Sequence, residues 1–488
     1  MRWNAIPITC RKFFRVTLDP IDCLPIAMFH PQTTHIAIIG AGPAGAATAL
    51  ALSTHAPELR ISLIEASDYR QMRFGETLHP AARLLLQRLQ LWDAFLAENH
   101  APSHGIISIW GQDAPTHNDF FTSLLGLGFH LDRCRFDAWM MTVAEQRGVR
   151  IMRQNRLTGA MRTDTGWRLQ LIDADNRRIA LDADFVVDAG GRRAPFARLV
   201  GARRVLYDRL IGAFLLFEDK QDTAIDSRTL IEASADGWWY GARLPGGRIA
   251  AACMTDVDIT RRLSLAHRGA WLTAAMQAQH LSRWLGGAQP TGTPILCPAQ
   301  AGRLDVCTGW HWLAVGDAAV SFDPLSGQGL VQALRGGISA AYAIADSLMQ
   351  QPAASVRYAA GIDAEVCAFL SARDHYYALE QRWPDQHFWR RRQQRVELSP
   401  QQLLQAAPEA DSHPASLLYL SQAQRRRVLD LCLRQRTAHE IVHNLCVETK
   451  LPARHWLLVL QYLIKIGALI LMPHPRSLSD FPSANLIK

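Results

Sequence analysis

The sequence HIAIIGAGPAGAATALALS at residues 35–53, followed by RISLIEA at residues 60–66, decides the fold. Residues 36–39 and 61–64 predict two short buried strands, and the alanine-rich run between them predicts a helix. Three glycines separate the first strand from the helix in G-x-G-x-x-G spacing, and an acid ends the second strand. This order is typical of a dinucleotide-binding βαβ unit.

Each part of this unit has a physical reason. Gly40 permits the tight turn, Gly42 lets a pyrophosphate approach the backbone, and Gly45 lets the helix lie close to the strand. The phosphates would face the free N–H groups at the helix N-terminus, and Glu65 would accept hydrogen bonds from ribose hydroxyls. The predicted residues of this site are Gly40, Gly42, Pro43, Ala44, Gly45 and Glu65.

Two later segments repeat the pattern of an apolar strand followed by a glycine turn. DFVVDAGG at 184–191 carries Asp188, and WLAVGDAAVSFDPLSGQGL at 312–330 carries Gly316, Asp317 and a glycine pair that opens a long helix. A second glycine turn at a helix N-terminus suits an electron-rich oxygen face, such as the pyrimidine edge of a flavin.

Composition narrows the class of protein. The chain has 488 residues, 49% of them apolar and 20% charged, with a formal charge of +8, which is typical of a globular protein. Its nine cysteines form no CxxC pair and no cluster with histidines, so we expect no metal site and a reduced, cytoplasmic protein. The apolar stretches 36–52 and 456–472 are interrupted by glycines or polar residues, so we expect no stable membrane association.

The three ordered motifs, with FHLDRCRFDAWM at 129–140 and GETLHP at 75–80, resemble the FAD-dependent aromatic hydroxylases and their relatives, the flavin-dependent halogenases and geranylgeranyl reductases. The resemblance spans about residues 35–395. It implies an α/β fold, with a Rossmann-like FAD-binding domain of the glutathione-reductase type and an inserted β-sheet substrate domain. It also implies FAD as cofactor, NAD(P)H or an external reductant as electron donor, and O2 as co-substrate. The FAD-site residues that it adds are Arg133, Asp188, Gly316, Asp317, Pro324, Gly327, Gln328 and Gly329.

The expected domain organisation has five parts. They are a disordered extension (1–34), the FAD-binding monooxygenase domain (35–396) with its substrate sheet at about 205–300, a linker (397–416), a winged-helix-like module (417–475) and a tail (476–488). The module should contain a basic helix at 421–434, a second helix that begins at a Thr437–Glu440 capping box, a third that begins at Pro452, and a strand in ALILM. Such a module could pack against the flavin domain, dock a peptide or bind DNA. The apolar face of its third helix disfavours nucleic acid.

Four readings of the reaction remain open: hydroxylation of an aromatic group, halogenation, reduction of an isoprenoid double bond, and a flavin-bearing regulatory or binding protein. The halogenase branch uses a lysine shortly after a GES-like loop, but this chain has no lysine between Phe13 and Asp219. The W-x-W-x-I-P motif of that branch is also missing. Halogenation is therefore disfavoured. Reduction of an isoprenoid double bond would favour a long apolar tunnel and often a membrane-facing surface, and the sequence shows no clear sign of either.

The run GWWYGARLPGG at 237–247 predicts a strand of the substrate sheet, with Trp238 and Tyr240 on one face and Trp239 on the other. One face could present flat aromatic surface to an aromatic substrate, or the rings could simply fill the core. An aromatic face and a peptide-docking module together resemble the flavoprotein monooxygenase that hydroxylates a peptide tryptophan in cysteine tryptophylquinone biogenesis of quinohemoprotein amine dehydrogenase. The resemblance implies a polypeptide substrate; a small aromatic metabolite is the alternative. The candidate catalytic residues are Glu76, His79, Asp323, Trp238, Trp239 and Tyr240, the first three for proton transfer.

Overall fold

A computed structural model describes residues 34–219, 226–349, 351, 353–393, 398–408, 422–449, 453–465 and 468–472. The predicted N-terminal extension, apart from Thr34, and the predicted 476–488 tail lie outside these residues. Within them, no helix is both long enough and apolar enough to cross a membrane.

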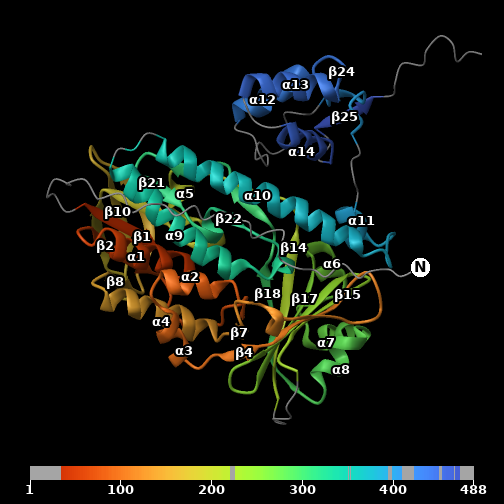
Figure 1. Cartoon of the computed structure of the whole chain (residues 1–488), viewed down its shortest axis with the longest axis horizontal. Coiled ribbons are helices and arrows are strands. Elements are labelled where there is room, and N and C mark those ends of the chain that lie inside the picture. The colour runs from red at the N-terminus through yellow and green to blue at the C-terminus, as the bar shows by residue number, and fades with distance from the viewer. Residues whose placement is uncertain are drawn as a thin grey trace, which may run out of the picture.

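The first motif folds as predicted, into β1 (His35–Ile39), α1 (Pro43–His55) and β2 (Arg60–Glu65). These strands are central to a six-stranded sheet of order β20-β21-β12-β1-β2-β8, in which only β20 runs antiparallel to its neighbour. The other strands are β8 (Arg150–Arg153), β12 (Phe185–Asp188), β20 (Thr308–Gly309) and β21 (Trp312–Ala314). Because β1, β12 and β21 are parallel, the three glycine turns that follow them lie at the same edge of the sheet. Figure 1 labels β1, β2 and β21 in this sheet.

Helices bury the apolar strands of this sheet. The long helix predicted after the glycine pair Gly327 and Gly329 is α9 (Gly329–Leu348), and it packs on α1. The contact is close because Gly337 has no side chain: a Cβ there would lie 2.6 Å from the carbonyl oxygen of Ala44. The helix α4 (Arg133–Gln146) packs on α1 as well. The remaining helices of this half are α2 (Ala82–Arg88), α3 (Trp92–Ala97) and α5 (Pro195–Leu199).

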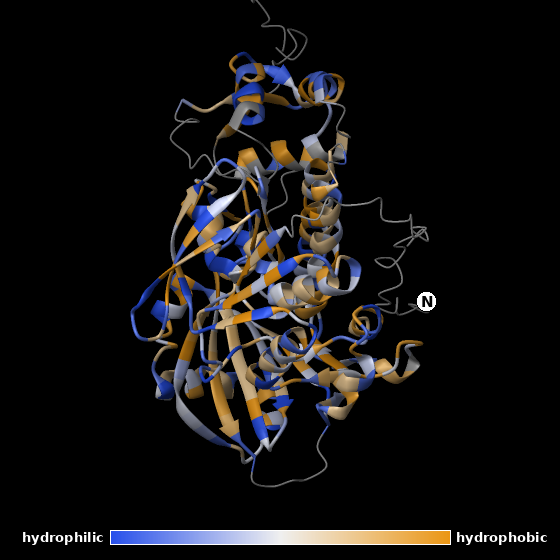
Figure 2. Cartoon of the chain, turned by 90° about the vertical axis from the view of Figure 1, so that its left-hand side faces the viewer, coloured by the Kyte–Doolittle hydropathy of each residue, from blue (hydrophilic) through white to orange (hydrophobic). Residues whose placement is uncertain are grey.

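The substrate sheet has seven strands in the order β18-β14-β17-β16-β15-β5-β6. Five of them come from the predicted range: β14 (Leu210–Glu218), β15 (Thr229–Ser234), β16 (Gly237–Leu244), β17 (Arg248–Asp256) and β18 (Gln289–Pro298). The expected bounds were incomplete, because β5 (Gly105–Ile109) and β6 (Thr116–Asp119) extend the sheet, with β5 parallel to β15. The strands β14 (LIGAFLLFE) and β17 (RIAAACMTD) are rich in apolar residues, and Figure 2 colours the chain by hydropathy.

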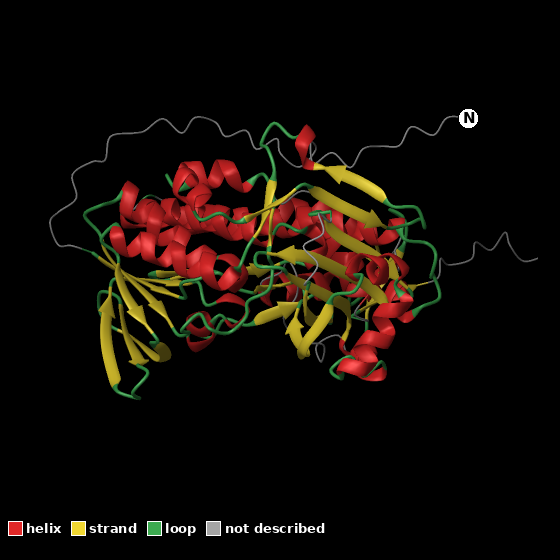
Figure 3. Ribbon diagram, turned by 90° about the horizontal axis from the view of Figure 1, so that it is seen from below, coloured by secondary structure: helices red, strands yellow, loops and turns green. Residues whose placement is uncertain are grey.

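Helices cover both faces of the substrate sheet. One face packs against α7 (Arg268–Gln277) and α8 (Gln279–Leu285), after the short α6 (Val257–Arg262). The other meets the end of α10 (Ala354–Leu379) and α11 (His387–Gln393). Figure 3 shows strand-rich regions at opposite ends of the body, with helices over them.

Three small sheets complete the body. They are β11-β10-β9, from Arg178–Ala183, Trp167–Ile172 and Arg156–Arg162; β13-β19-β22, from Arg204–Leu206, Gly302–Leu304 and Val320–Ser321; and β3-β7-β4, from Thr77–Leu78, Gly128–His130 and Ala101–Ser103.

The C-terminal module contains the three predicted helices and the predicted strand. They are α12 (Gln422–Leu431), α13 (Ala438–Thr449), α14 (Ala453–Lys465) and β25 (Leu469–Met472). The capping box is present: the Thr437 backbone N–H donates to Glu440 Oε2 (3.1 Å), and the Glu440 N–H donates to Thr437 Oγ1 (3.2 Å).

The predicted linker is wrong in one respect. Its residues Leu403–Ala406 form β23, the central strand of the module's sheet, between β24 (Arg436–Thr437) and β25. The module therefore begins before α12, and β23 was missed because a four-residue strand in a proline- and alanine-rich run has no clear period.

Candidate active site

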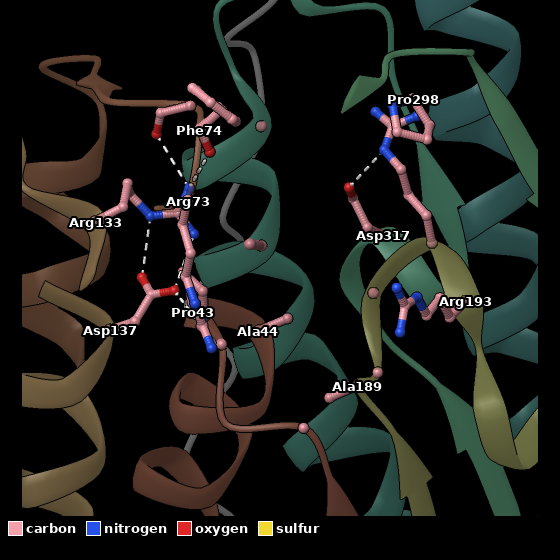
Figure 4. Close-up of a pocket in the computed structure, with 18 of the residues that line it drawn as sticks. Pro43, Ala44, Arg73, Phe74, Arg133, Asp137, Ala189, Arg193, Pro298 and Asp317 are labelled. Carbon is pink, nitrogen blue, oxygen red and sulfur yellow. Dashed lines mark hydrogen bonds and ion pairs between the residues drawn. The ribbon is translucent and has the colours of Figure 1, made fainter. Parts of the chain in front are cut away.

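One long cleft runs from the first glycine turn to the substrate sheet. Its volume is about 1150 Å³, which is above the range of small-ligand pockets. Figure 4 shows Arg73 and Arg133 converging on Asp137 at one wall, with Asp317 and Arg193 at the other. Among the predicted residues, the lining includes Gly40, Gly42, Pro43, Ala44, Glu65, Glu76, Arg133, Tyr240, Asp317, Asp323, Pro324, Gly327 and Gly329.

The three glycines of the first turn have different surroundings. A Cβ on Gly40 (φ +105°) would lie 2.4 Å from the carbonyl oxygen of Ala189, and a Cβ on Gly45 would lie 1.9 Å from that of Gly40. A Cβ on Gly42 would meet nothing within 4 Å. Gly42 faces the cleft and precedes α1 with no side-chain cap. The N–H groups of the first turn of α1 are therefore open to an anion in the cleft.

Carboxylates and arginines form a network on the β2 side of the cleft. Glu65 Oε2 accepts a hydrogen bond from the Ala41 backbone N–H (2.8 Å), so it fixes the glycine turn itself. Arg73 bridges Glu65 (3.2 Å) and the buried Asp137 (2.8 Å), and Arg133 Nε donates to Asp137 (3.0 Å). Arg133 also donates to the carbonyl oxygens of Phe74 and Gly75, and so holds the loop that begins at Gly75.

The glycine turn at residues 316–329, which follows β21, forms the opposite wall of the cleft. Asp317 pairs with Arg192 (3.2 Å) and keeps a side chain that is 46% exposed. Gly316 (φ +59°) permits close packing, since its Cβ would lie 2.5 Å from the Ala44 Cβ. Gly316 itself does not line the cleft, and neither does Gln328, the residue before α9. The N-terminus of α9 has no side-chain cap.

Asp188 has a structural position. Its side chain is fully buried and accepts hydrogen bonds from the backbone N–H groups of Gly190 (2.9 Å) and Ala197 (2.8 Å). Burial raises the pKa of this carboxyl to about 6. Asp188 does not line the cleft, so its expected contact with the cofactor is replaced by support of the turn that carries the lining residue Gly190.

The substrate end of the cleft is aromatic, but not through the tryptophans. Side chains of β16 alternate as predicted, and Tyr240 faces the cleft. Trp238 lies in the core beside Tyr377, to whose hydroxyl its Nε1 donates (3.2 Å). Trp239 lies in the core on the opposite face, with its ring centroid 5.2 Å from that of Trp271. Both tryptophans therefore fill the core, and the reading in which their rings face the substrate is wrong. The apolar lining residues near Tyr240 are Phe74, Phe214, Met254 and Cys297.

The three candidates for proton transfer differ sharply. Glu76 lines the cleft and is buried; its Oε2 accepts from the Tyr240 hydroxyl (3.1 Å), and its Oε1 has no partner. Burial raises the pKa of this carboxyl. Asp323 also lines the cleft, but both of its oxygens are engaged, by the Leu325 N–H and the Tyr377 hydroxyl. His79 is not in the lining, and its Nδ1 accepts from the Ala81 N–H.

Apart from Arg133, the arginines that line the cleft were not assigned to the site from the sequence. They are Arg73, Arg156, Arg192, Arg193 and Arg198. The signal was present in the composition, because only five of the 52 basic residues are lysines. Arginine binds phosphate and carboxylate through two parallel hydrogen bonds, but composition does not say which arginines share a cleft.

These features fit FAD. The cleft has two helix N-termini without side-chain caps, an open position at Gly42, several arginines for a diphosphate, and an aromatic end for a flat ring. Gly40 to Ala44 would hold the diphosphate, and Asp317 and the N-terminus of α9 would hold the flavin half.

Replacing Asp317 by alanine should lower the FAD content of the purified protein by about tenfold at limiting FAD, the factor that corresponds to about 1.4 kcal/mol. The change removes an exposed carboxylate and leaves Arg192 unpaired beside the flavin half. The ratio of flavin to protein absorbance measures it. Asp346→Ala, which removes a surface ion pair with Arg357 outside the cleft, is the control. An unchanged ratio in Asp317→Ala would count against this placement.

Comparison with known proteins identifies the family. Residues 35–123 and 106–415 match the tryptophan halogenase family. LodB of Marinomonas mediterranea, an FAD-dependent oxidoreductase by name, is 30% identical over 73% of this chain and 95% of LodB. The flavin-dependent halogenase otaD of Aspergillus carbonarius is 23% identical over 65% of this chain and 69% of that protein.

Solved structures share the fold at lower identity. The flavin-dependent halogenase CmlS has a TM-score of 0.66 and 20% identity, and the alignment covers 91% of this chain and 96% of CmlS. QhpG, a peptidyl tryptophan dihydroxylase essential for tryptophylquinone cofactor biogenesis, has a TM-score of 0.60 and 22% identity over 88% of this chain and 99% of QhpG. The expected fold class is confirmed, and the chain is an FAD-dependent oxidoreductase that belongs to the tryptophan halogenase family.

Proposed function

We propose that this enzyme is a monooxygenase that hydroxylates an electron-rich aromatic group, and that its substrate is a tryptophan side chain of a partner polypeptide. The observation that carries the proposal is Glu76, a buried carboxyl with one unpartnered oxygen at the aromatic end of the cleft. A proton donor beside aromatic side chains suits oxygen transfer to an indole.

The basic side chains that line the cleft favour hydroxylation over halogenation. The halogenases that the chain resembles use a lysine near the loop that here contains Glu76, and no described lining residue is a lysine. An arginine does not replace it, because a guanidinium stays protonated and offers no amine nitrogen to react. The halogenase relatives therefore share the fold of this chain, but the described lining of its cleft lacks the lysine that halogenation would use.

The aromatic end of the cleft suits a flat substrate. The rings of Phe74 and Phe214 stack with centroids 3.9 Å apart, and Tyr240 and Met254 line the same region. Such surfaces hold an aromatic ring by offset or edge-to-face contact, and methionine adds favourable sulfur contacts.

The residues that line the cleft have different roles in the proposed reaction. When bound, reduced FAD supplies the electrons that activate O2, and NAD(P)H or an external reductant restores them. Arg73 and Arg133 keep the Asp137 carboxylate paired, and Arg133 holds the Phe74–Gly75 backbone that leads into Glu76. Glu76 Oε1 faces no protein partner, so it is the atom that exchanges a proton with the reacting groups.

The polypeptide substrate is inferred from the C-terminal module and the QhpG likeness. The fold of QhpG covers 88% of this chain, which extends past the flavin domain. The module presents partly exposed apolar side chains, among them Val447, Leu457, Ile470 and Leu471. Figure 1 shows it as a separate unit above α10, as expected for a docking domain.

The test mixes the purified enzyme with FAD and NADH or NADPH under air, with and without a tryptophan-containing polypeptide. A mass gain of about 16 or 32 units, one or two oxygen atoms, is the expected result. Chloride and bromide arms cover halogenation, in which a halogen replaces hydrogen. Flavin reduction without any mass gain on the polypeptide, but with conversion of free indole, would move the proposal to a small aromatic substrate.

A chain that ends at Gln393 tests the module, because a cut after residue 408 would strand β23 without partners. We expect this truncated enzyme to keep its FAD and to oxidise free indole normally. Its KM for a polypeptide should rise by at least about tenfold, which corresponds to about 1.4 kcal/mol of docking energy. Steady-state kinetics on both substrates decide between docking and packing: an equal loss on both would show that the module only stabilises the fold.

A further inference from the structure

The turn that leads into α9 is held from behind the cleft by a side chain of α10. The buried Asp323 begins this turn, and its Oδ1 accepts from the Leu325 backbone N–H (2.9 Å). Its Oδ2 accepts from the Tyr377 hydroxyl (2.8 Å), which belongs to a residue 54 positions later in the chain. The first bond is local to the turn, whereas the second ties the turn to α10. The turn contributes to the cleft lining through Pro324, Ser326, Gly327 and Gly329.

The Tyr377 hydroxyl has a fixed position and a fixed direction. The Tyr377 ring is buried, and its centroid lies 6.0 Å from those of Phe388 and Trp389 on α11. Trp238 Nε1 donates to the Tyr377 oxygen (3.2 Å). An indole nitrogen can only donate, so the one hydrogen of the hydroxyl remains for Asp323. Residues of β16, α10 and α11 thus direct a single donor at the turn.

Asp323 depends on this donor because its carboxyl is buried. Burial and the nearby Asp208 raise the pKa of Asp323, and the hydrogen bonds from Leu325 and Tyr377 oppose that rise. A buried acceptor that loses its partner is costly, and the cleft is the open space that Asp323 borders. Without the Tyr377 hydroxyl, the carboxyl would turn toward the cleft, and the turn would lose its tie to α10.

We propose that Tyr377 is a positioning residue for FAD: its hydroxyl holds Asp323, and thereby keeps the turn at residues 324–329 in the shape that receives the flavin half. Tyr377 does not line the cleft, so it acts through Asp323 and not by contact with the cofactor. This role concerns the cofactor and not the substrate. It therefore goes beyond the proposed hydroxylation and does not depend on it.

Tyr358 offers a matched control on the same helix. It is also a buried tyrosine of α10, and its hydroxyl donates to the Ala314 carbonyl oxygen (2.9 Å). Neither Tyr358 nor Ala314 lines the cleft. A change from tyrosine to phenylalanine removes one buried hydroxyl at either position, but only at Tyr377 does the lost bond end on a residue of the cleft lining.

The experiment dilutes the FAD-loaded, full-length protein and follows the fluorescence of the released FAD, with no substrate present. Tyr377→Phe should raise the dissociation constant for FAD by about tenfold, which corresponds to about 1.4 kcal/mol, and should change the visible circular dichroism of the bound flavin. Tyr358→Phe should leave both unchanged. An equal rise of the dissociation constant in the two variants would show a purely structural role and overturn the proposal.

A double substitution tests whether the effect passes through Asp323. Asp323→Ala should weaken FAD binding by itself, and Tyr377→Phe should then add nothing, because the effects of residues in contact are not additive. A tenfold effect of Tyr377→Phe that persists in the Asp323→Ala protein would overturn the assignment.

Should Tyr377→Phe fail to fold, Trp238→Phe takes its place. Loss of the indole donor frees the Tyr377 hydroxyl to turn away from Asp323, so the dissociation constant should rise by about threefold. Trp271→Phe is the control, since Trp271 Nε1 donates to the Ala213 carbonyl oxygen (2.8 Å) outside the cleft. An unchanged dissociation constant in Trp238→Phe, or an equal rise in both tryptophan variants, would overturn the proposal. Because these measurements contain no substrate, their outcome is separate from that of the hydroxylation test.

Discussion

Gly42→Ala should leave the fold intact and still deprive the enzyme of FAD, whereas Gly45→Ala should disturb the fold itself. The two glycines lie three residues apart in one turn, but an added Cβ meets nothing within 4 Å at Gly42 and lies 1.9 Å from the Gly40 carbonyl oxygen at Gly45. At Gly42 the methyl group occupies the space that the diphosphate would use. At Gly45 it separates α1 from the turn after β1.

These contacts give the expected sizes of the two effects, the loss of FAD affinity and the loss of folding stability. Gly42→Ala should raise the dissociation constant for FAD by tenfold or more, equivalent to at least about 1.4 kcal/mol, with an apo-protein melting temperature close to that of the wild type. Gly45→Ala should lose about 1–3 kcal/mol of folding stability, the usual cost of overpacking. Fluorescence titration with FAD and thermal unfolding of the apo-protein measure the two effects. Equal melting temperatures for both variants would contradict the close helix–turn contact.

Glu76→Gln should reduce the yield of hydroxylated product by about 100-fold or more, in the range expected for loss of a general acid. The amide has the same shape as the carboxyl and keeps a partner for Tyr240, so FAD content and folding should stay near wild type. Product per reduced nicotinamide consumed, measured by mass spectrometry under single-turnover conditions, reports the effect.

Glu232→Gln is the matched control for this variant. Glu232 is also buried, but its carboxylate accepts from the backbone N–H groups of His280 and Leu281 at the start of α8, outside the cleft. This substitution should affect stability and leave the product yield unchanged. If Glu76→Gln lost flavin in proportion to product, Glu76 would be a cofactor-binding residue.

The sequence predicted local structure well where a short-range rule applies. The βαβ unit follows from glycine spacing within one turn, and the Thr437–Glu440 box follows from hydrogen bonds over three residues. Features that depend on distant partners were not accessible. The strand β5 joins the substrate sheet by pairing with β15, more than a hundred residues later in the chain, and nothing in its own sequence shows that partner.

The sequence predicts which turns form the site. It does not predict which side chains of the neighbouring strands point into the cleft. Alternation along β16 correctly separates Trp239 from its neighbours, yet it does not show that Tyr240 reaches the cleft while Trp238 is covered by α10. Likewise, Asp188 ends a strand in the way expected of a ligand-binding acid, but its carboxylate is used by the backbone of the following turn.

The order of strands around β1 also governs how the protein matures on the ribosome. β1 emerges first among the described strands, but its sheet requires β12 at residues 185–188 and β21 at residues 312–314, and α9 follows still later. Domains fold as units during synthesis, which proceeds from the N-terminus, and the closing of long loops is slow. The ribosome must therefore synthesise the whole substrate sheet before the flavin cleft can form. FAD can bind only after β21 and α9 have been synthesised.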